Sequence, residues 1–151
     1  IEERVMKLKT KTGGTERIAD IRKEMTKSME DGCGIYRLEE TMQATCDKLG
    51  ELRERFKNIS IDDKSSVWNT DWLTAIELDY QLDVAQAMAH SALNRKESRG
   101  GHAREDYPKR DDVNYMMHTM AYKKGTDLIS DIELGYKPVV QTRYEPMERK
   151  Y

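Results

Sequence analysis

Between Leu38 and Phe56, apolar residues with one threonine among them recur at alternating spacings of four and three residues. The positions are Leu38, Met42, Thr45, Leu49, Leu52 and Phe56. This heptad rhythm predicts a helix that lies along other helices at a small crossing angle. The chain is therefore expected to fold around a helical bundle.

Two further helices are predicted on either side of this one. The first begins after Thr15, which can cap it, and ends at Gly32 and Gly34. Its apolar residues are Ile18, Ile21, Met25 and Met29, at spacings of three and four.

The third helix is predicted to begin at Asn69 or Thr70 and to continue to about Lys96. It carries two apolar stripes, one of Leu73, Ile76, Tyr80, Val84 and Ala87, the other of Trp72, Ala75, Leu82, Ala89 and Leu93. A helix that is apolar on two faces is expected to be covered on two sides, so this helix should be central.

A strongly charged segment follows the third helix. From Arg95 to Asp112 the sequence reads RKESRGGHAREDYPKRDD, with six basic and five acidic residues. Gly100, Gly101 and Pro108 prevent a continuous helix. The segment is thus predicted to be a loop that is either a solvated surface or a recognition surface.

The hydrophobic period changes after this loop. Residues Tyr115 to Tyr122 are rich in strand formers, residues 123–127 look like a turn, and Ile132, Leu134 and Tyr136 alternate with polar residues and glycine. This pattern predicts a β-hairpin, and the proline-bearing residues that follow predict an extended C-terminal arm.

The predicted fold is therefore mainly α: a three-helix bundle with a long central third helix, followed by the charged loop, the β-hairpin and the extended arm. Residues 1–14 are basic, end in two glycines and have scattered apolar residues, so they are predicted to be a linker. Residues 15–98 form the bundle, and residues 99–151 pack on it within the same domain.

Composition argues against several classes of function. The chain has 28 acidic and 26 basic residues, a formal net charge of −2, so binding to nucleic acid is not expected. No apolar run approaches the 18 or so residues that cross a bilayer, and a soluble chain is expected. Cys33 and Cys46 are too far apart for a Cys-x-x-Cys motif, which favours two free thiols in a reducing compartment.

The sequence supplies no convincing catalytic, cofactor or metal site. Gly32-Cys-Gly34 begins like a dinucleotide fingerprint, but Arg37 replaces the third glycine and no strand precedes it. The three histidines, His90, His102 and His118, are too scattered for a local metal signature. Ser98, His102 and Asp106 are the residue types of a catalytic triad. The sequence around Ser98 lacks the strained turn that positions such a nucleophile.

The loop resembles the C-terminal domain of the flavoprotein subunit of succinate dehydrogenases and fumarate reductases. The resemblance is carried by Glu97–Pro108 and Arg110–Asp112 and extends to Trp68–Asp71, Ala85–Ala92, Tyr136–Val139 and the terminal Pro146, Arg149 and Tyr151. The Ser-Arg-Gly-x-His core is shared with L-aspartate oxidase, and the continuation His-Ala-Arg-Glu-Asp favours the succinate and fumarate enzymes. Gly101 departs from the family, which usually has alanine at this position.

This resemblance implies a parent chain that binds FAD and transfers a hydride between flavin and a C4 dicarboxylate. The residues for that chemistry lie in domains before this one, so the fragment alone is expected to be inactive and to hold no cofactor. Its expected partners are the FAD-binding domain of the same polypeptide and an iron–sulfur subunit with its clusters. Membrane contact is expected only through anchor subunits, on the cytoplasmic side of an inner membrane or the matrix side in mitochondria.

The site expected on this basis is a docking surface rather than an active site. Its residues are Arg99, His102, Arg104, Asp106 and Arg110, because guanidinium groups give bidentate bonds to carboxylates and the glycines permit close approach. Arg99 and Arg104 are predicted to form inter-domain or inter-subunit salt bridges. Two alternatives remain: a free-standing helical adaptor that recognises an unrelated protein, and the corresponding domain of a related flavoprotein such as L-aspartate oxidase.

Overall fold

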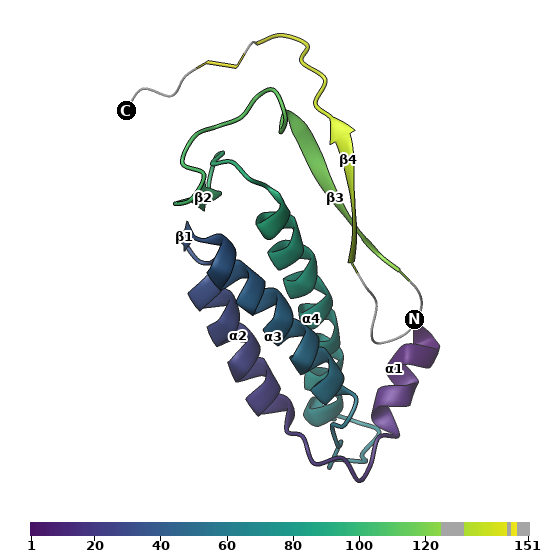
Figure 1. Cartoon of the computed structure of the whole chain (residues 1–151). Coiled ribbons are helices and arrows are strands. Elements are labelled where there is room, and N and C mark those ends of the chain that lie inside the picture. The colour runs from purple at the N-terminus through teal and green to yellow at the C-terminus, as the bar shows by residue number, and fades with distance from the viewer. Residues whose placement is uncertain (125–131, 145, 148–151) are drawn as a thin grey trace.

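The computed structural model of the chain describes residues 1–124, 132–144 and 146–147. The helices are α1 (Glu2–Lys9), α2 (Ile18–Cys33), α3 (Glu39–Phe56) and α4 (Thr70–Asn94), and the strands are β1 (Tyr36–Arg37), β2 (Ala103–Arg104), β3 (Met117–Lys123) and β4 (Ile132–Pro138). Helices α2, α3 and α4 lie side by side as a bundle (Figure 1), which confirms the mainly α prediction.

The core of the bundle is formed by the residues that the helical periods predicted. In α3, Met42, Thr45, Leu49, Leu52 and Phe56 are all buried. Leu38 is partly exposed because it is the residue before the first turn of that helix. The α4 side of the core consists of Ala75, Leu78, Leu82, Ala85 and Ala89.

The helix ends confirm one predicted cap and correct another. Asn69 caps α4, because its side-chain oxygen accepts from the backbone N–H of Trp72 at 2.7 Å. Thr15 does not cap α2, which begins at Ile18. Its hydroxyl instead accepts from Asn58, and Glu16 forms an isolated bridge with Ile59, so this segment is held beside the residues that follow α3.

Residues 2–9 form helix α1, where an irregular linker was predicted. A helix of eight residues is marginal on its own in water, so its tertiary contacts decide its conformation. Leu8 is buried in the core, and the indole N–H of Trp72 donates to the carbonyl of Val5 at 3.0 Å. Those contacts involve residues far away in the sequence, which is why the local pattern does not reveal the helix.

A group of charged side chains joins α1, α3, α4 and the hairpin. The side chains of Arg53 of α3 and Asp79 of α4 are each only 1% exposed, and Nη1 of the arginine lies 2.7 Å from Oδ1 of the aspartate. Arg4 of α1 pairs with both Asp79 and Asp83, and Lys123 of β3 donates to Asp83 at 2.6 Å. We call these five residues the buried charge cluster; it ties the terminal helix and the hairpin to the bundle.

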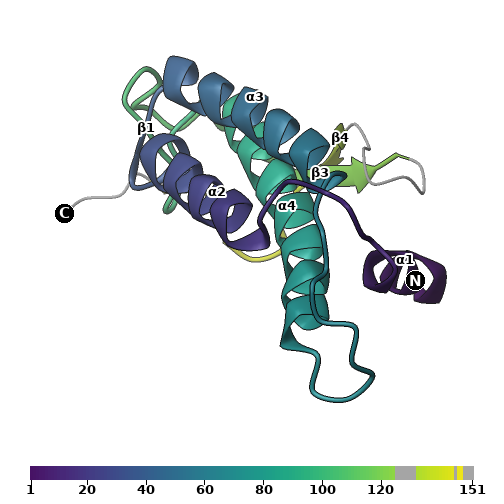
Figure 2. The same ribbon diagram turned by 90° about the horizontal axis from the view of Figure 1, so that it is seen from below.

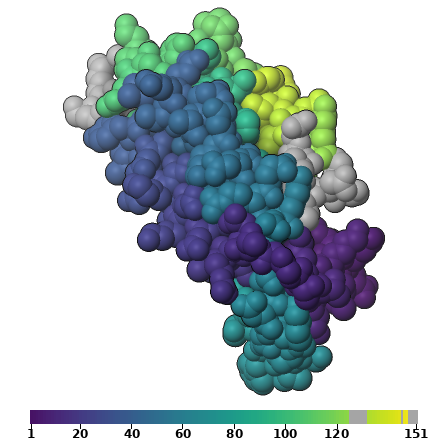
Figure 3. All heavy atoms as spheres, turned by 60° about the horizontal axis from the view of Figure 1, so that its bottom comes forward, coloured from purple at the N-terminus to yellow at the C-terminus, as the bar shows by residue number. Residues whose placement is uncertain are grey.

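Three residues of the predicted stripe that begins at Leu73, together with Met88, are not covered as the sequence predicted. Leu73, Tyr80, Val84 and Met88 are 52%, 39%, 58% and 54% exposed. Their spacings of seven, four and four place them on one face of α4, opposite the core residues. We call these four residues the outer stripe. Figure 2 shows how the beginning of α4, with the connection that precedes it, extends beyond α2 and α3, and the same end stands out in the space-filling view of Figure 3.

The predicted β-hairpin is confirmed. Strands β3 and β4 pair antiparallel, from Met117 opposite Pro138 to Lys123 opposite Ile132. The hairpin lies along the second half of α4 (Figure 1), to which Tyr136 is joined by a hydrogen bond to Asn94. Most of the turn predicted at residues 123–127 lies outside the described residues.

Gly32 allows α2 to approach α3 closely. A Cβ added at this position would lie 2.0 Å from the hydroxyl oxygen of Thr45 and 2.6 Å from the carbonyl oxygen of Thr41. We therefore expect Gly32→Ala to lower the free energy of unfolding by about 2 kcal/mol, as overpacking of a core does. Urea denaturation would measure this change.

Gly50→Ala is the matched control, because a Cβ at this helical position of α3 meets nothing within 4 Å. It should stabilise the chain by about 0.5–1 kcal/mol through helix propensity. Equal effects of the two substitutions would contradict the close approach at Gly32.

Candidate docking site around the charged loop

The charged loop begins where α4 ends, at Asn94, and turns sharply at its glycines. The N–H of Arg99 donates to the carbonyl of His102 at 2.9 Å, and the N–H of His102 donates back at 3.0 Å. Gly100, inside this turn, has a φ of 61°, a conformation that glycine adopts without a steric cost. The loop is thus an ordered turn and not a solvated run of charges.

Glu97 is the buried centre of the loop. Its carboxylate accepts from Arg95, from Arg99 at 2.8 and 3.0 Å, and from the backbone N–H of Asp111 at 2.8 Å. Burial alone would raise the pKa of Glu97, but the bonds from Arg99, Asp111 and Arg95 outweigh it and lower that pKa. Three segments of the loop therefore meet at one ionised carboxylate.

Arg104 and Asp106 connect the ends of two helices. The Arg104 side chain is buried and donates to the carbonyl of Leu93 at 3.1 Å, at the open end of α4. Its guanidinium also forms two bonds of 2.6 Å to Asp106, whose other contact is the first backbone N–H of α3, at Glu39. The bonds from Arg104 are the largest cause of the low pKa of Asp106, about 2.

His102 is fixed in a neutral form. Its Nδ1 accepts from the Arg37 guanidinium at 2.8 Å, so the proton is on Nε2, which donates to the carbonyl of Arg95 at 3.1 Å. Burial and the positive charges of Arg37, Arg104 and Arg95 lower the pKa of His102, against a smaller effect of the bond to the carbonyl.

Arg110 ties the C-terminal arm to the loop. It pairs with Asp112 at 2.8 Å and donates to the carbonyl of Met147 at 2.9 Å. Arg99 also bonds Asp112, at 2.7 Å, so the two arginines share one carboxylate.

The five predicted docking residues therefore lie in one loop, each with partners inside this chain. Ion pairs and hydrogen bonds inside this chain therefore balance the charges of these residues. That the same residues contact another domain or subunit stays a prediction. The residues of the triad drawn from the sequence have separate partners: Ser98 bonds Tyr107 and Arg104, His102 bonds Arg37, and Asp106 bonds Arg104.

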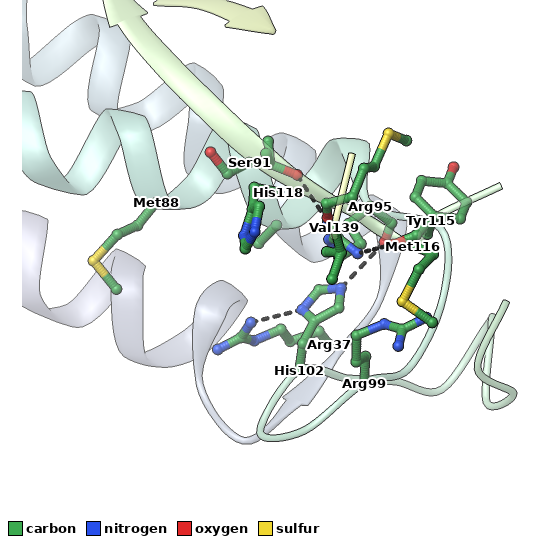
Figure 4. A pocket seen from close by; sticks show the side chains of 13 residues that line it. Arg37, Met88, Ser91, Arg95, Arg99, His102, Tyr115, Met116, His118 and Val139 are labelled. Atoms are coloured by element: carbon green, nitrogen blue, oxygen red, sulfur yellow. Dashed lines mark hydrogen bonds between the residues drawn. The ribbon is translucent and has the colours of Figure 1, made fainter. Parts of the chain in front are cut away.

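A cavity of about 590 Å³ opens beside the loop, between the end of α4 and β3 (Figure 4). It is lined by Arg37, Met88, Ser91, Ala92, Arg95, Arg99, His102, Tyr115, Met116, Met117, His118, Thr119 and Val139. Five of these residues are arginine or histidine, and none is acidic. The sequence did not indicate Arg37 or His118 as partners of the loop, because they come from segments distant in the chain.

Metal ligands do not gather in the part of the chain that the structure describes: no three histidine, cysteine, aspartate or glutamate side chains are placed to hold one ion. Within the same described residues, no helix combines the length and the apolarity needed to cross a bilayer.

Comparison with known proteins gives one consistent family. Residues 22–151 match the model described as "Fumarate reductase flavoprotein C-term". The chain is 53% identical to a fumarate reductase flavoprotein subunit of Serratia sp., over all of this chain and 25% of that protein. It is 40% identical to the succinate dehydrogenase flavoprotein subunit of Rickettsia bellii, over 87% of this chain and 22% of that protein.

A solved structure has the same fold. A mutant of Escherichia coli quinol fumarate reductase FrdA superposes with a TM-score of 0.89 at 50% identity, over 97% of this chain and 25% of that one. The chain thus spans about a quarter of the length of the relatives that it matches.

Proposed function

Because the chain belongs to the family of fumarate reductase flavoprotein C-terminal domains, we propose that it works as the non-catalytic docking domain of a longer succinate dehydrogenase or fumarate reductase flavoprotein. In this proposal the preceding domains bind FAD and transfer the hydride to or from the C4 dicarboxylate. This chain packs against those domains and holds no cofactor of its own.

The observation that carries the proposal is the outer stripe. Leu73, Tyr80, Val84 and Met88 form one exposed apolar face on the longest helix. An exposed face with several large apolar residues is expected to be covered by protein in the assembled molecule. The relatives contain about three times as much additional chain to cover it, since this chain matches about a quarter of each.

The remaining partners follow from the family and are part of the same proposal. An iron–sulfur subunit receives or delivers the electrons, and anchor subunits connect the complex to the membrane on its cytoplasmic or matrix side. The solved relatives include a quinol–fumarate reductase with menaquinol molecules, which supports membership in such a complex. A free-standing adaptor is not favoured, because the relatives match this chain from end to end as part of a larger subunit.

The outer stripe gives a direct test in the full-length flavoprotein. We expect the double substitution Val84→Glu and Met88→Glu to prevent docking, because two unpaired carboxylates would be buried at the interface. The full-length protein should lose most of its bound flavin and its assembly with the iron–sulfur subunit, measured by the flavin absorbance per chain and by size-exclusion chromatography.

Two controls separate docking from folding. In the 151-residue chain both side chains are more than half exposed, so each substitution should change the free energy of unfolding by less than about 0.5 kcal/mol. Met6→Glu, at an exposed position of α1, should leave flavin content and assembly as in the parent protein. Normal flavin content and assembly in the double variant would refute the proposed docking face.

A further inference from the structure

Arg37 is a positive charge that is held in place without an acidic partner. Its Nε donates to the carbonyl of Gly34 at 2.9 Å, and its Nη1 donates to Nδ1 of His102 at 2.8 Å. Both acceptors are neutral. Among the residues that the structure describes, no carboxylate lies within ion-pairing distance of Arg37, whereas Arg99 and Arg104 each have two.

The cavity beside the loop concentrates this charge. Figure 4 shows Arg37, His102 and His118 around the opening, with Met88 at one side. The other two arginines of the lining, Arg95 and Arg99, are already paired with Glu97. An open hollow with a fixed guanidinium, apolar walls and no acidic lining residue favours an anion with an apolar neighbour.

Met88 links this cavity to the outer stripe, since it belongs to both. A protein surface that covers the outer stripe as far as Met88 would therefore reach the opening of this cavity. A cation that is left unpaired at the edge of such an interface is complementary to a carboxylate on the opposing surface.

We propose that this cavity is a carboxylate-binding pocket, in which Arg37 receives an aspartate or glutamate side chain from the preceding domains of the same polypeptide. The inference rests on the proposed function and adds to it the chemistry of the contact. The apolar lining at Met88, Met116 and Val139 accommodates an apolar residue beside that acid. His102 acts here as a positioning residue, because its neutral Nδ1 orients the guanidinium without cancelling its charge.

The test uses the full-length flavoprotein with Arg37→Lys and a water-soluble carbodiimide. The carbodiimide activates a carboxyl group, the introduced amine attacks the activated carbon, an amide forms, and the carboxyl oxygen leaves with the reagent as a urea. Arginine does not undergo this reaction, so the parent protein supplies the background. We expect peptide mass spectrometry to find position 37 joined to an acidic residue outside these 151 residues.

Arg143→Lys is the matched control, because Arg143 is exposed on the C-terminal arm and also has no ion pair among the described residues. The link at position 37 should be about tenfold more abundant than any link at position 143, because a docked pair reacts at a high effective concentration. Failure to find a link, or links only to acids of this chain such as Glu39 or Asp106, would overturn the proposal.

A free small carboxylate is the other source of the same chemistry. The reaction is repeated with added isotope-labelled benzoate, and benzoylation at position 37 in place of a protein link would also overturn the proposal. The two tests use different proteins, and Arg37→Lys leaves the outer stripe intact. If Val84→Glu with Met88→Glu abolishes docking while the Arg37→Lys protein forms no link, the docking domain stands and only the carboxylate contact is rejected.

Discussion

Asp79→Ala is expected to lower the free energy of unfolding of the 151-residue chain by about 3–5 kcal/mol. Asp79 lies in the buried charge cluster, where it faces Arg53 at 2.7 Å and also accepts from Arg4. Removal of its carboxylate leaves the Arg53 guanidinium buried with less compensation, and an uncompensated buried charge is more costly than the loss of the bond itself. Equilibrium denaturation in urea, followed by circular dichroism, measures the change.

The control is to remove the charges together. Arg53→Met combined with Asp79→Leu replaces the pair by apolar groups of similar size. It should recover much of the lost free energy of unfolding, because neither partner is left as an unpaired buried charge. Asp47→Ala removes an exposed carboxylate on α3 and should cost less than about 0.5 kcal/mol. If Asp79→Ala were as mild as Asp47→Ala, the cluster would make little contribution to stability.

Glu97→Ala is expected to cost about 3 kcal/mol and to loosen the charged loop. Glu97 accepts bonds from Arg95, Arg99 and the N–H of Asp111, and no other acid in the loop has this burial. Without the Glu97 carboxylate, the guanidinium groups of Arg95 and Arg99 repel each other. The backbone N–H of Asp111 also loses its acceptor. Hydrogen exchange at Arg99 and His102 should accelerate together with the fall in stability, whereas exchange in the middle of α3 should follow global unfolding only.

The pH dependence of stability gives a second test of Glu97. Its folded-state pKa lies below the ordinary value of 4.5, so its ionised form stabilises the chain above that pH and this contribution is lost as the pH falls through the lower folded value. Glu97→Gln should therefore reduce the loss of stability below about pH 4.5. Part of the loss should remain, because the pKa values of Glu24 and Asp106 are also lowered, each to about 2.

The bundle could be predicted from the sequence because its signal is local. The spacing of Met42, Leu49 and Phe56 specifies a helix and its buried face without reference to the rest of the chain. Helix α1 could not be predicted in this way, since its position depends on Trp72 and on the acids of α4. The exposure of Leu73 and Val84 was also missed, because a pattern shows that a face is apolar and not which chain covers it.

The candidate site was only half visible in the sequence. Arg99, His102 and Arg104 were singled out by their glycine-rich, charged context, and the structure places them together. Composition alone does not distinguish Glu97 from the other four acids of the loop, although its position between Arg95 and Arg99 is a usable signal for a buried ion pair. Arg37 had no such signal, because the parallel pairing of β1 with β2 brings it to His102 from 65 residues away.

The contacts of Arg104 and Asp106 also fix the number of residues that can separate these two side chains. Arg104 donates to a carbonyl at the end of α4, and Asp106 accepts from the first N–H of α3. Only one residue separates the two, so both contacts form only while this separation is kept. An inserted or deleted residue between them would withdraw one of the two from its helix. Surface loops commonly vary in length between related proteins, whereas these three residues are constrained by the two helix ends that they contact.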